Sequence, residues 1–320
     1  MNLRFKLAAI LAGSLSISTN AVSGEELSVA TFVPPSHETI TGALAWFENE
    51  LTSRSNGELT LKVYAAGQLG AGPTQQYKRA VEGVADITFG IAASTPTLFP
   101  KTMLAILPGK ALDGPDSTRR MWTVFDKYMA DEWSDVKVLA VGNPAGGMII
   151  ATKDVSTIEG MKGTKIVPWA AITTPVLQGM GAVPVQLDPT EHYTALSTGT
   201  IDAAISSINN IMPPWNLDEV ANYAVVNTPA TFNPVFYVMN KERYESLSAK
   251  HQKIIDEISG MPFSMQLVQA FHDADEVALK WKDEKIAAGE LNVEWIVTSD
   301  RERAKMEAAA AAGMDAIYSD

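Results

Sequence analysis

The stretch from Gly160 to Ala204 decides the fold, and it reads GMKGTKIVPWAAITTPVLQGMGAVPVQLDPTEHYTALSTGTIDAA. Its pattern predicts a short basic strand, a Pro-Trp corner, a helix, a second strand, another helix and a third strand. The second helix has a clear start, because Asp188 can cap it and Pro189 suits its first turn. Strands that alternate with helices are typical of an α/β domain. The stretch contains no arginine, and none occurs anywhere from Met121 to Glu242.

The rest of the chain predicts a second α/β domain around this one. Apolar alternation predicts strands at 26–32, 59–63, 85–89 and 136–141, with helical patterns at 36–56, 73–84 and 116–133. Asn143–Gly147 is a glycine-containing corner where we expect the chain to cross to a second lobe, and Asn233–Met239 reads as a strand that returns. The predicted first lobe comprises residues 24–147 and about 233–260, and the predicted second lobe comprises residues 148–232. A long helix over about 248–288, interrupted near Gly260, is expected to span both lobes. Residues 289–320 are predicted to form a last strand and helix.

Residues 1–23 have the features of a secretory signal peptide. Arg4 and Lys6 precede an apolar run from Leu7 to Ile17, and Ala21-Val22-Ser23 offers small residues for cleavage. The apolar run is shorter than the ~20 residues that a membrane-spanning helix needs. We therefore expect export across the inner membrane and a periplasmic mature chain that begins near Gly24.

The composition disfavours several classes of function. The formal net charge is −12, and it becomes −14 when Arg4 and Lys6 leave with the signal peptide. An acidic chain repels nucleic acid, whose binding depends on Lys and Arg meeting phosphate. The chain has no cysteine, so thiol nucleophiles and thiolate metal sites are excluded.

Signatures of catalysis, metal binding and cofactor binding are also missing from the sequence. The four histidines are His37, His192, His251 and His272, and no two of them lie three to five residues apart. Each is therefore more typical of a structural histidine than of a metal ligand. No glycine-rich nucleotide loop and no nucleophile elbow occur in the mature chain. We expect no cofactor, no metal and no enzymatic activity; an exported enzyme on the same scaffold is the alternative from another class.

Short motifs along the chain resemble one known family. They are Gly67–Gly70, Gly83–Asp86, Leu107-Pro108, Met161–Ile166, Met180–Val185 and the run from Glu191 to Asp202. In this order and at these separations they resemble the solute-binding subunits of tripartite ATP-independent periplasmic (TRAP) transporters, the DctP-like family. The resemblance implies a two-lobed periplasmic binding protein fold that closes on one small solute. It also implies a monomer that delivers the solute to a small and a large membrane permease subunit.

The chain departs from this family where the ligand is usually held. Family members place an arginine after the lysine–isoleucine pair, and here Val167-Pro168-Trp169 stands there; Met148 occupies the place of a second arginine. A buried carboxylate that loses its charged partner typically loses ~2–5 kcal/mol of binding energy. The missing arginines therefore favour a neutral or cationic ligand, such as an amine or amino alcohol. The alternative is an aromatic or hydroxy carboxylic acid held by backbone N–H groups.

Position relative to the family nominates the ligand-binding residues. Aromatic faces attract cations, and an asparagine amide can bind a hydroxyl or an amine. The expected ligand-binding residues are Phe32, Trp169, Asn209, Trp215, Phe232 and Asn233. A second group of candidates comprises His37, Met148, Asp202 and Phe236.

Overall fold

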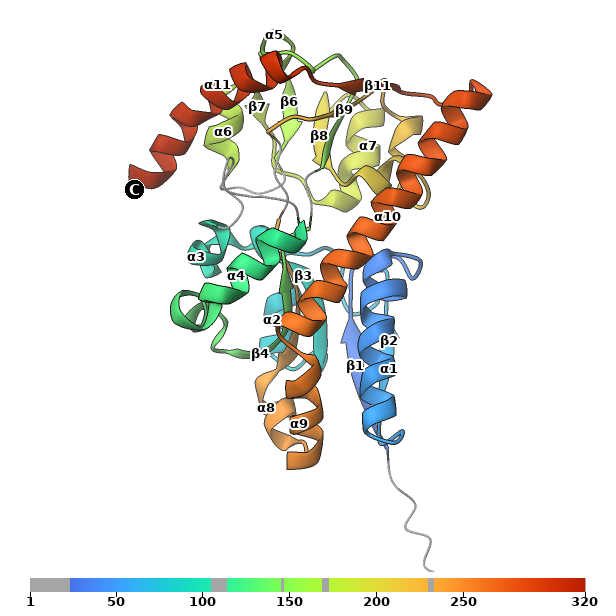
Figure 1. The fold of residues 1–320 in the computed structure, drawn as a ribbon, viewed down its shortest axis with the longest axis vertical. Coiled ribbons are helices and arrows are strands. Elements are labelled where there is room, and N and C mark those ends of the chain that lie inside the picture. Colours follow the sequence, from blue (N-terminus) through green and yellow to red (C-terminus); the bar gives the residue numbers. More distant parts are fainter. Residues whose placement is uncertain (1–23, 105–113, 145–146, 169–172, 230–232, 320) are drawn as a thin grey trace, which may run out of the picture.

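The computed structural model describes residues 24–104, 114–144, 147–168, 173–229 and 233–319. In these residues the strands form two separate sheets, one with five strands and one with six. Each sheet has helices packed on it, which gives two α/β lobes stacked along the long axis of the molecule (Figure 1). The α/β, two-lobed fold that the sequence predicts is therefore confirmed.

The first lobe is built on the five-stranded sheet. Its elements are β1 (Glu25–Ala30), α1 (Ala45–Arg54), β2 (Leu59–Tyr64), α2 (Gln76–Val81), β3 (Ile87–Ile91), α3 (Pro100–Met103), α4 (Gly114–Tyr128), β4 (Val136–Gly142), β10 (Val235–Asn240), α8 (Lys241–Ser246) and α9 (Ala249–Ile258). The strand order is β2-β1-β3-β10-β4. β1 runs parallel to β2 and β3, whereas β10 returns from the other lobe and lies antiparallel to β3 and β4.

The second lobe contains the stretch that opened the sequence analysis. Its elements are β5 (Met148–Ala151), α5 (Ile158–Met161), β6 (Lys165–Val167), α6 (Thr174–Gly179), β7 (Val183–Pro184), α7 (His192–Ser197), β8 (Ala203–Ser206), β9 (Tyr223–Val226), β11 (Glu294–Val297) and α11 (Asp300–Ser319). The strand order is β11-β9-β5-β8-β6-β7. β5 is antiparallel to both neighbours, and the other pairs are parallel.

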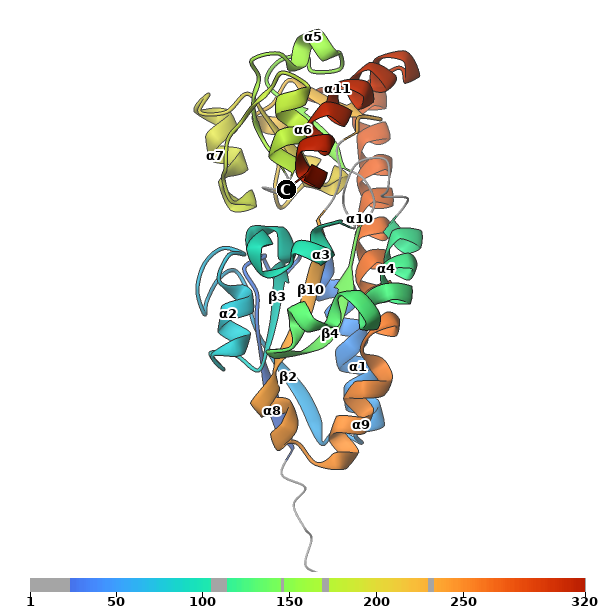
Figure 2. The same cartoon turned by 90° about the vertical axis from the view of Figure 1, so that its left-hand side faces the viewer.

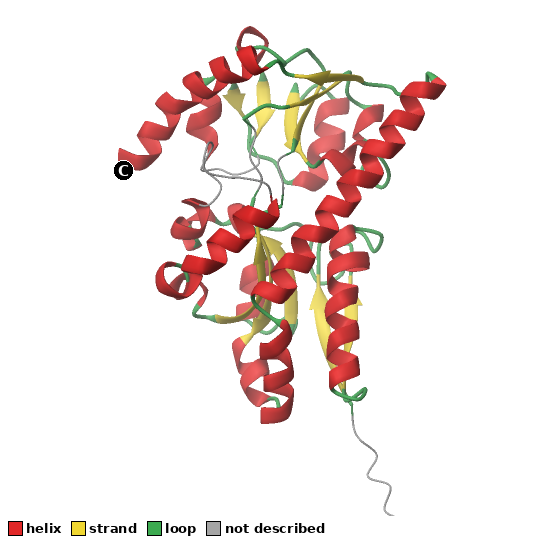
Figure 3. Ribbon diagram, in the orientation of Figure 1, coloured by secondary structure: helices red, strands yellow, loops and turns green. Residues whose placement is uncertain are grey.

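A long helix, α10 (Met261–Ala288), connects the lobes. It packs on β4 and α4 in the first lobe and on the short helical turn Ile208–Ile211 in the second. Figures 2 and 3 show α10 running beside both lobes, from the end of α9 in the first lobe to the outer end of the second lobe, which is drawn at the top. Gly260 separates α9 from α10 with a φ of 72°, a conformation that glycine adopts without strain. The predicted interruption of the long helix is confirmed at this residue.

The core of the first lobe is strongly aromatic. Phe99 stacks on Trp133 with ring centroids 4.1 Å apart, and Phe236 lies 5.4 Å from Trp133 in an edge-to-face contact. The indole N–H of Trp133 donates to Thr102 Oγ1 at 3.2 Å, so its one polar atom is satisfied. Such pairs stabilise a core beyond the burial of their surface. β10 therefore supplies a core ring to the first lobe as well as a strand.

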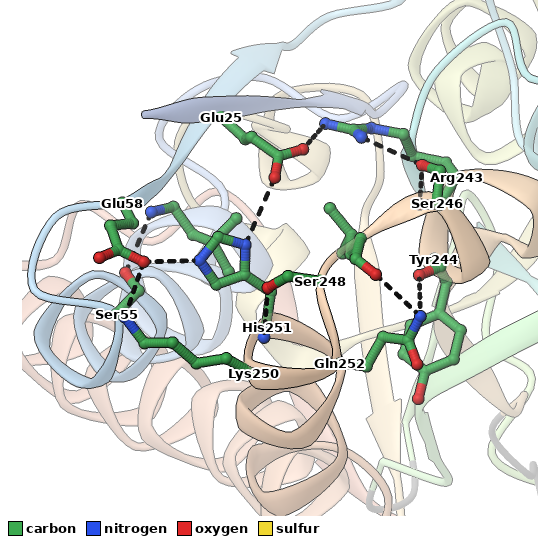
Figure 4. A network of polar contacts seen from close by, with 12 residues as sticks. Glu25, Ser55, Glu58, Arg243, Tyr244, Ser246, Ser248, Lys250, His251 and Gln252 are labelled. Atoms are coloured by element: carbon green, nitrogen blue, oxygen red, sulfur yellow. Dashed lines mark hydrogen bonds and ion pairs between the residues drawn. The ribbon is translucent and has the colours of Figure 1, made fainter. Parts of the chain in front are cut away.

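A polar network, drawn in Figure 4, involves α8 and α9, which Figure 1 shows at the end of the first lobe that lies far from the second lobe. His251 of α9 stands between two carboxylates, with Nε2 2.9 Å from Glu58 and Nδ1 3.3 Å from Glu25. Lys250 reaches Glu58 at 2.7 Å and Arg243 reaches Glu25 at 2.9 Å. The network attaches α8 and α9 to the first residues of the β1–β2 pair, which is a structural role for this histidine.

Most predicted elements are found within a few residues of their expected places. The largest difference is the helix expected at 73–84, which covers only 76–81 as α2. Gly72, just before the expected helix, and Gly83, inside it, both have positive φ, so the chain forms turns on either side of α2. The helix expected at 116–133 divides into α4 and a short 3₁₀ turn, Ala130–Trp133.

Close packing of α6 on α11 depends on the small size of Gly179. A Cβ atom at Gly179 would lie 2.5 Å from the Ala309 carbonyl oxygen, a distance that real Cβ atoms do not show. The backbone conformation at this glycine is not strained, so close approach alone explains the residue. The C-terminal helix is thereby held against the second lobe.

We expect Gly179→Ala to lower the free energy of unfolding by about 1–3 kcal/mol, because overpacking forces α6 and α11 apart. Urea unfolding monitored by circular dichroism measures the change. Gln178→Ala, at an exposed neighbouring position, should stay within about 0.5 kcal/mol of the wild type. Equal stability of Gly179→Ala and wild type would contradict the packing of these two helices.

Candidate ligand-binding site between the lobes

A cavity of about 390 Å³ lies between the two lobes, and we call it the main cavity. Its size is within the range of sites that hold small organic molecules. The first lobe contributes residues that follow β3 and precede α2, and the second contributes residues that follow β6 and β7. The lining consists of Thr74, Ile91, Ala93, Ser94, Pro96, Pro168, Gln186, Leu187, Asp188, Pro189, Glu191, His192 and Asn233.

The second-lobe wall of the main cavity is shaped by the turn before α7. Asp188 and Glu191 form a reciprocal capping box, in which Asp188 N donates to Glu191 Oε2 at 2.9 Å. The Asp188 carboxylate also accepts a hydrogen bond from the Thr74 side chain of the first lobe. The predicted helix cap is therefore present, and the same aspartate contacts both lobes.

A second cavity, of about 320 Å³, opens beside α10, and we call it the helix-side cavity. It is lined by Ser36, Glu38, Thr41, Gly42, Asn209, Met212, Pro213, Pro214, Ala270, Asp273, Ala274 and Val277. Asn209 links three parts of the fold here. Its backbone N–H donates to Asp275 Oδ1 of α10 at 3.0 Å, and its side-chain amide donates to Glu38 of the first lobe.

The two carboxyl groups that hold Asn209 are largely buried, since the Glu38 side chain is 13% exposed and Asp275 is 8% exposed. Burial raises the pKa of Glu38 to about 7, against the smaller opposing effect of its hydrogen bonds. Burial also raises the pKa of Asp275 to about 7, and the nearby Glu38 adds to the shift. Burial without a neighbouring cation raises the free energy of the charged carboxylate, so both groups retain their protons to higher pH than usual.

Aromatic groups surround His37, the neighbour of Glu38 in the sequence, which lies close to the contact between Glu38 and Asn209. Its ring meets the rings of Trp215 and Phe271 edge-on, with centroids 6.2 and 6.0 Å away. Nδ1 lies 3.0 Å from Thr39 Oγ1, and burial lowers the pKa of His37 to about 3. His37 is therefore uncharged at neutral pH. Its contact with Glu38, 3.4 Å long, is not an ion pair.

Three of the proposed ligand-binding residues lie at the junction of the lobes. Asn233 lines the main cavity and Asn209 lines the helix-side cavity. Trp215 bridges to His37 and has its indole Nε1 buried without a hydrogen-bond partner in the described chain. His37, from the second group of candidates, belongs to the same junction.

Other proposed residues lie in the hydrophobic cores. Phe32 stacks on Phe89 in the first-lobe core, with centroids 5.7 Å apart, and Phe236 belongs to the aromatic cluster around Trp133. Met148 is fully buried in a second-lobe cluster. Val167, at the position where the resemblance implies an arginine, belongs to the same apolar cluster. None of these side chains is among the described residues that line either cavity.

Asp202 lies outside both cavities and supports a strand end. Its carboxylate accepts a hydrogen bond from Lys165 N at 2.8 Å and lies 3.6 Å from Lys153 Nζ. The two remaining proposed residues, Trp169 and Phe232, lie outside the described residues.

Sequence reasoning missed the polar residues of the main cavity, above all His192, Gln186, Ser94 and Thr74. His192 is 3% exposed, and its Nε2 atom has no hydrogen-bond partner among the described residues. Burial lowers its pKa to about 4. The only indication in the sequence that His192 lies at the site was its position between Glu191 and Tyr193, inside a motif that carries the family resemblance.

The chemistry of the site suits non-covalent binding. The described lining of both cavities contains carboxyl, amide, hydroxyl and imidazole groups but no lysine or arginine. No group of three or more His, Asp or Glu side chains in the described ranges is placed to hold a metal ion. Within the described residues, no helix is long and apolar enough to cross a membrane.

The raised pKa of Glu38 predicts a pH-dependent stability. Between its ordinary pKa near 4.5 and its folded pKa near 7, the folded state keeps a proton that the unfolded state has lost, so stability falls as pH rises through this window. Glu38→Gln keeps the acceptor for Asn209 and removes the ionisation. At pH 8 it should unfold with a free energy about 1–3 kcal/mol higher than wild type, and at pH 4.5 the two should be nearly equal.

Urea unfolding at both pH values measures this difference. Glu245→Gln, at an exposed position of α8, is the matched control and should change stability by less than about 0.5 kcal/mol at either pH. An equal effect of Glu38→Gln at pH 4.5 and pH 8 would contradict a buried, titrating Glu38.

Comparison with known proteins shows the family to which this chain belongs. The model of bacterial extracellular solute-binding protein family 7 (DctP) matches residues 29–320. The outer membrane transporter protein TsaT of Comamonas testosteroni is 26% identical over 299 residues, which cover 90% of this chain and 85% of that protein.

Two solved structures share both the fold and part of the sequence. One is a TRAP solute-binding protein from Rhodoferax ferrireducens in complex with copurified benzoate; it has a TM-score of 0.84 and 26% identity, covering 92% of this chain and 90% of that chain. The other is a marine metagenome TRAP solute-binding protein specific for aromatic acid ligands, in complex with metahydroxyphenylacetate. It has a TM-score of 0.83 and 27% identity, covering 91% of both chains. The chain belongs to bacterial extracellular solute-binding protein family 7 and is a DctP-like TRAP solute-binding protein.

Proposed function

We propose that this TRAP solute receptor binds an aromatic carboxylic acid between its lobes and delivers it to the membrane permease. The observation that carries the proposal is the ligand of its relatives. Chains with TM-scores of 0.82–0.84 and 26–27% identity hold benzoate, 3-hydroxybenzoate and metahydroxyphenylacetate. The sequence analysis placed a neutral or cationic ligand first and an aromatic or hydroxy acid second, and these relatives favour the reverse order.

The main cavity can hold such an acid without an arginine. Ser94, Gln186 and the neutral His192 provide uncharged hydrogen-bonding groups around it, and Ile91, Pro96 and Leu187 provide apolar surface for a ring. A carboxylate that accepts two or three hydrogen bonds from neutral donors is well stabilised in its charged form. The loss of arginine therefore changes how a carboxylate would be held and does not exclude one.

An amine ligand is the second candidate, because Asp188 and Glu191 line the main cavity and Glu38 and Asp273 line the helix-side cavity. These carboxylates would attract a cation. Catalysis on the solute has no support from the described residues, and the related proteins bind solutes without a stated reaction.

The cellular setting follows the family. We propose that residues 1–23 direct export, that the mature chain works in the periplasm as a monomer, and that a small and a large membrane subunit receive its solute. We also propose that Asn209, Trp215 and Asn233 form the junction that closes over the ligand.

Thermal unfolding of the mature protein with benzoate, 3-hydroxybenzoate, ethanolamine and choline separates the two candidates. A ligand present at 100 times its dissociation constant adds about 2.7 kcal/mol of stability, which raises the melting temperature of a chain of this size by about 4–8 °C. We expect such a rise with the aromatic acids only. A rise with the amines and none with any aromatic acid would reverse the proposal.

A further inference from the structure

His192 is one of the second-lobe residues that line the main cavity. It is the first residue of α7, and its side chain is 3% exposed. Its Nε2 atom is buried and has no hydrogen-bond partner within the described part of the chain. Buried polar groups in folded proteins nearly always have a partner, so each exception calls for an explanation. A polar group of the bound solute would supply this one.

The histidine offers the hydrogen bonding of a neutral ring. Burial lowers its pKa to about 4, so the imidazole is uncharged at neutral pH. A neutral imidazole has one N–H donor and one acceptor nitrogen. A hydroxyl group can both donate and accept, so it can pair with Nε2 in either tautomer. A carboxylate can only accept and would pair with one tautomer alone.

The charges beside His192 also select against an anion at this end of the cavity. Asp188 and Glu191 come from the turn before α7 and line the same cavity. Asp188 already accepts hydrogen bonds from Thr74 and from the Glu191 backbone, and Glu191 accepts one from Asp188 N. Both carboxylates therefore have their own partners and remain as negative neighbours. A ligand carboxylate here would face like charges, whereas a hydroxyl would not.

We propose that His192 is a specificity-determining residue, which binds a ring hydroxyl so that the receptor selects hydroxylated over unsubstituted aromatic acids. This inference rests on the proposed function and deepens it. The carboxylate of the ligand then lies away from α7, toward the first-lobe side of the cavity, where Ser94 is an uncharged donor. Shape and apolar contact would bind the ring, and Nε2 would recognise its substituent.

Isothermal titration calorimetry with benzoate, 3-hydroxybenzoate and 4-hydroxybenzoate tests the assignment. In the wild type, at least one hydroxybenzoate should bind about tenfold or more tightly than benzoate, the size expected for one buried hydrogen bond. In His192→Leu that ratio should fall to about one, with benzoate affinity changed by less than about threefold. His192→Gln should retain part of the preference, because an amide at that reach still donates and accepts.

His272→Leu is the matched control, because this histidine is exposed on α10 and lines neither cavity. It should bind all three acids as the wild type does. Melting temperatures without ligand check that each variant is folded, and His192→Gln keeps the test valid if His192→Leu is not.

The outcomes separate the two proposals. If benzoate binds as tightly as both hydroxybenzoates, or if His192→Leu keeps the preference, the role of His192 is overturned and the proposed function stands. If none of the three acids binds the wild type, the proposed ligand class is overturned, and the role of His192 falls with it.

Discussion

The hydrogen bonds of Asn209 to two carboxyl groups join the two lobes and the long helix. Glu38 comes from the first lobe, Asp275 from the long helix, and Asn209 from the second lobe. On the other side of the junction, Asp188 and Thr74 make a second contact between the lobes. Both contacts use groups that can separate without leaving an unpaired cation in the interface. Closure in periplasmic binding proteins is a hinge motion, and we expect these two polar contacts to permit one here.

The charge around the two cavities is a second constraint on which solute can bind. The described cavity residues carry negative or neutral groups, and burial keeps His37 and His192 neutral and holds the pKa of Glu38 and Asp275 near 7. We therefore expect a solute in the main cavity to be recognised by hydrogen bonds and apolar contact more than by a salt bridge. Sites of that kind discriminate strongly on hydroxyl groups, because a mismatched ligand leaves a buried polar group unpaired.

Local patterns in the sequence were enough to predict most of the fold, but less of the site. Period-two and helical patterns, the Asp188 cap and the Gly260 break each depend on nearby residues, and the structure contains them. Phe32, Phe236 and Met148 illustrate the limit, because a residue near a strand end can face either the cleft or the core, and only tertiary packing decides. The sequence did not nominate His192 as a ligand-binding residue, because a single histidine carries no pattern. The role that we propose for it depends on its burial beside a cavity formed by both lobes.

We propose that the receptor binds an aromatic acid in the main cavity, whose described lining contains no basic side chain to neutralise the carboxylate. A crystal structure of the mature protein with benzoate tests this most directly. We predict that the ring lies in the main cavity between Ser94, Gln186 and Asn233, with both carboxylate oxygens bonded to uncharged donors. A lysine or arginine nitrogen within about 4 Å of the ligand carboxylate, the usual limit of a salt bridge, would contradict it. So would a ligand bound outside the main cavity.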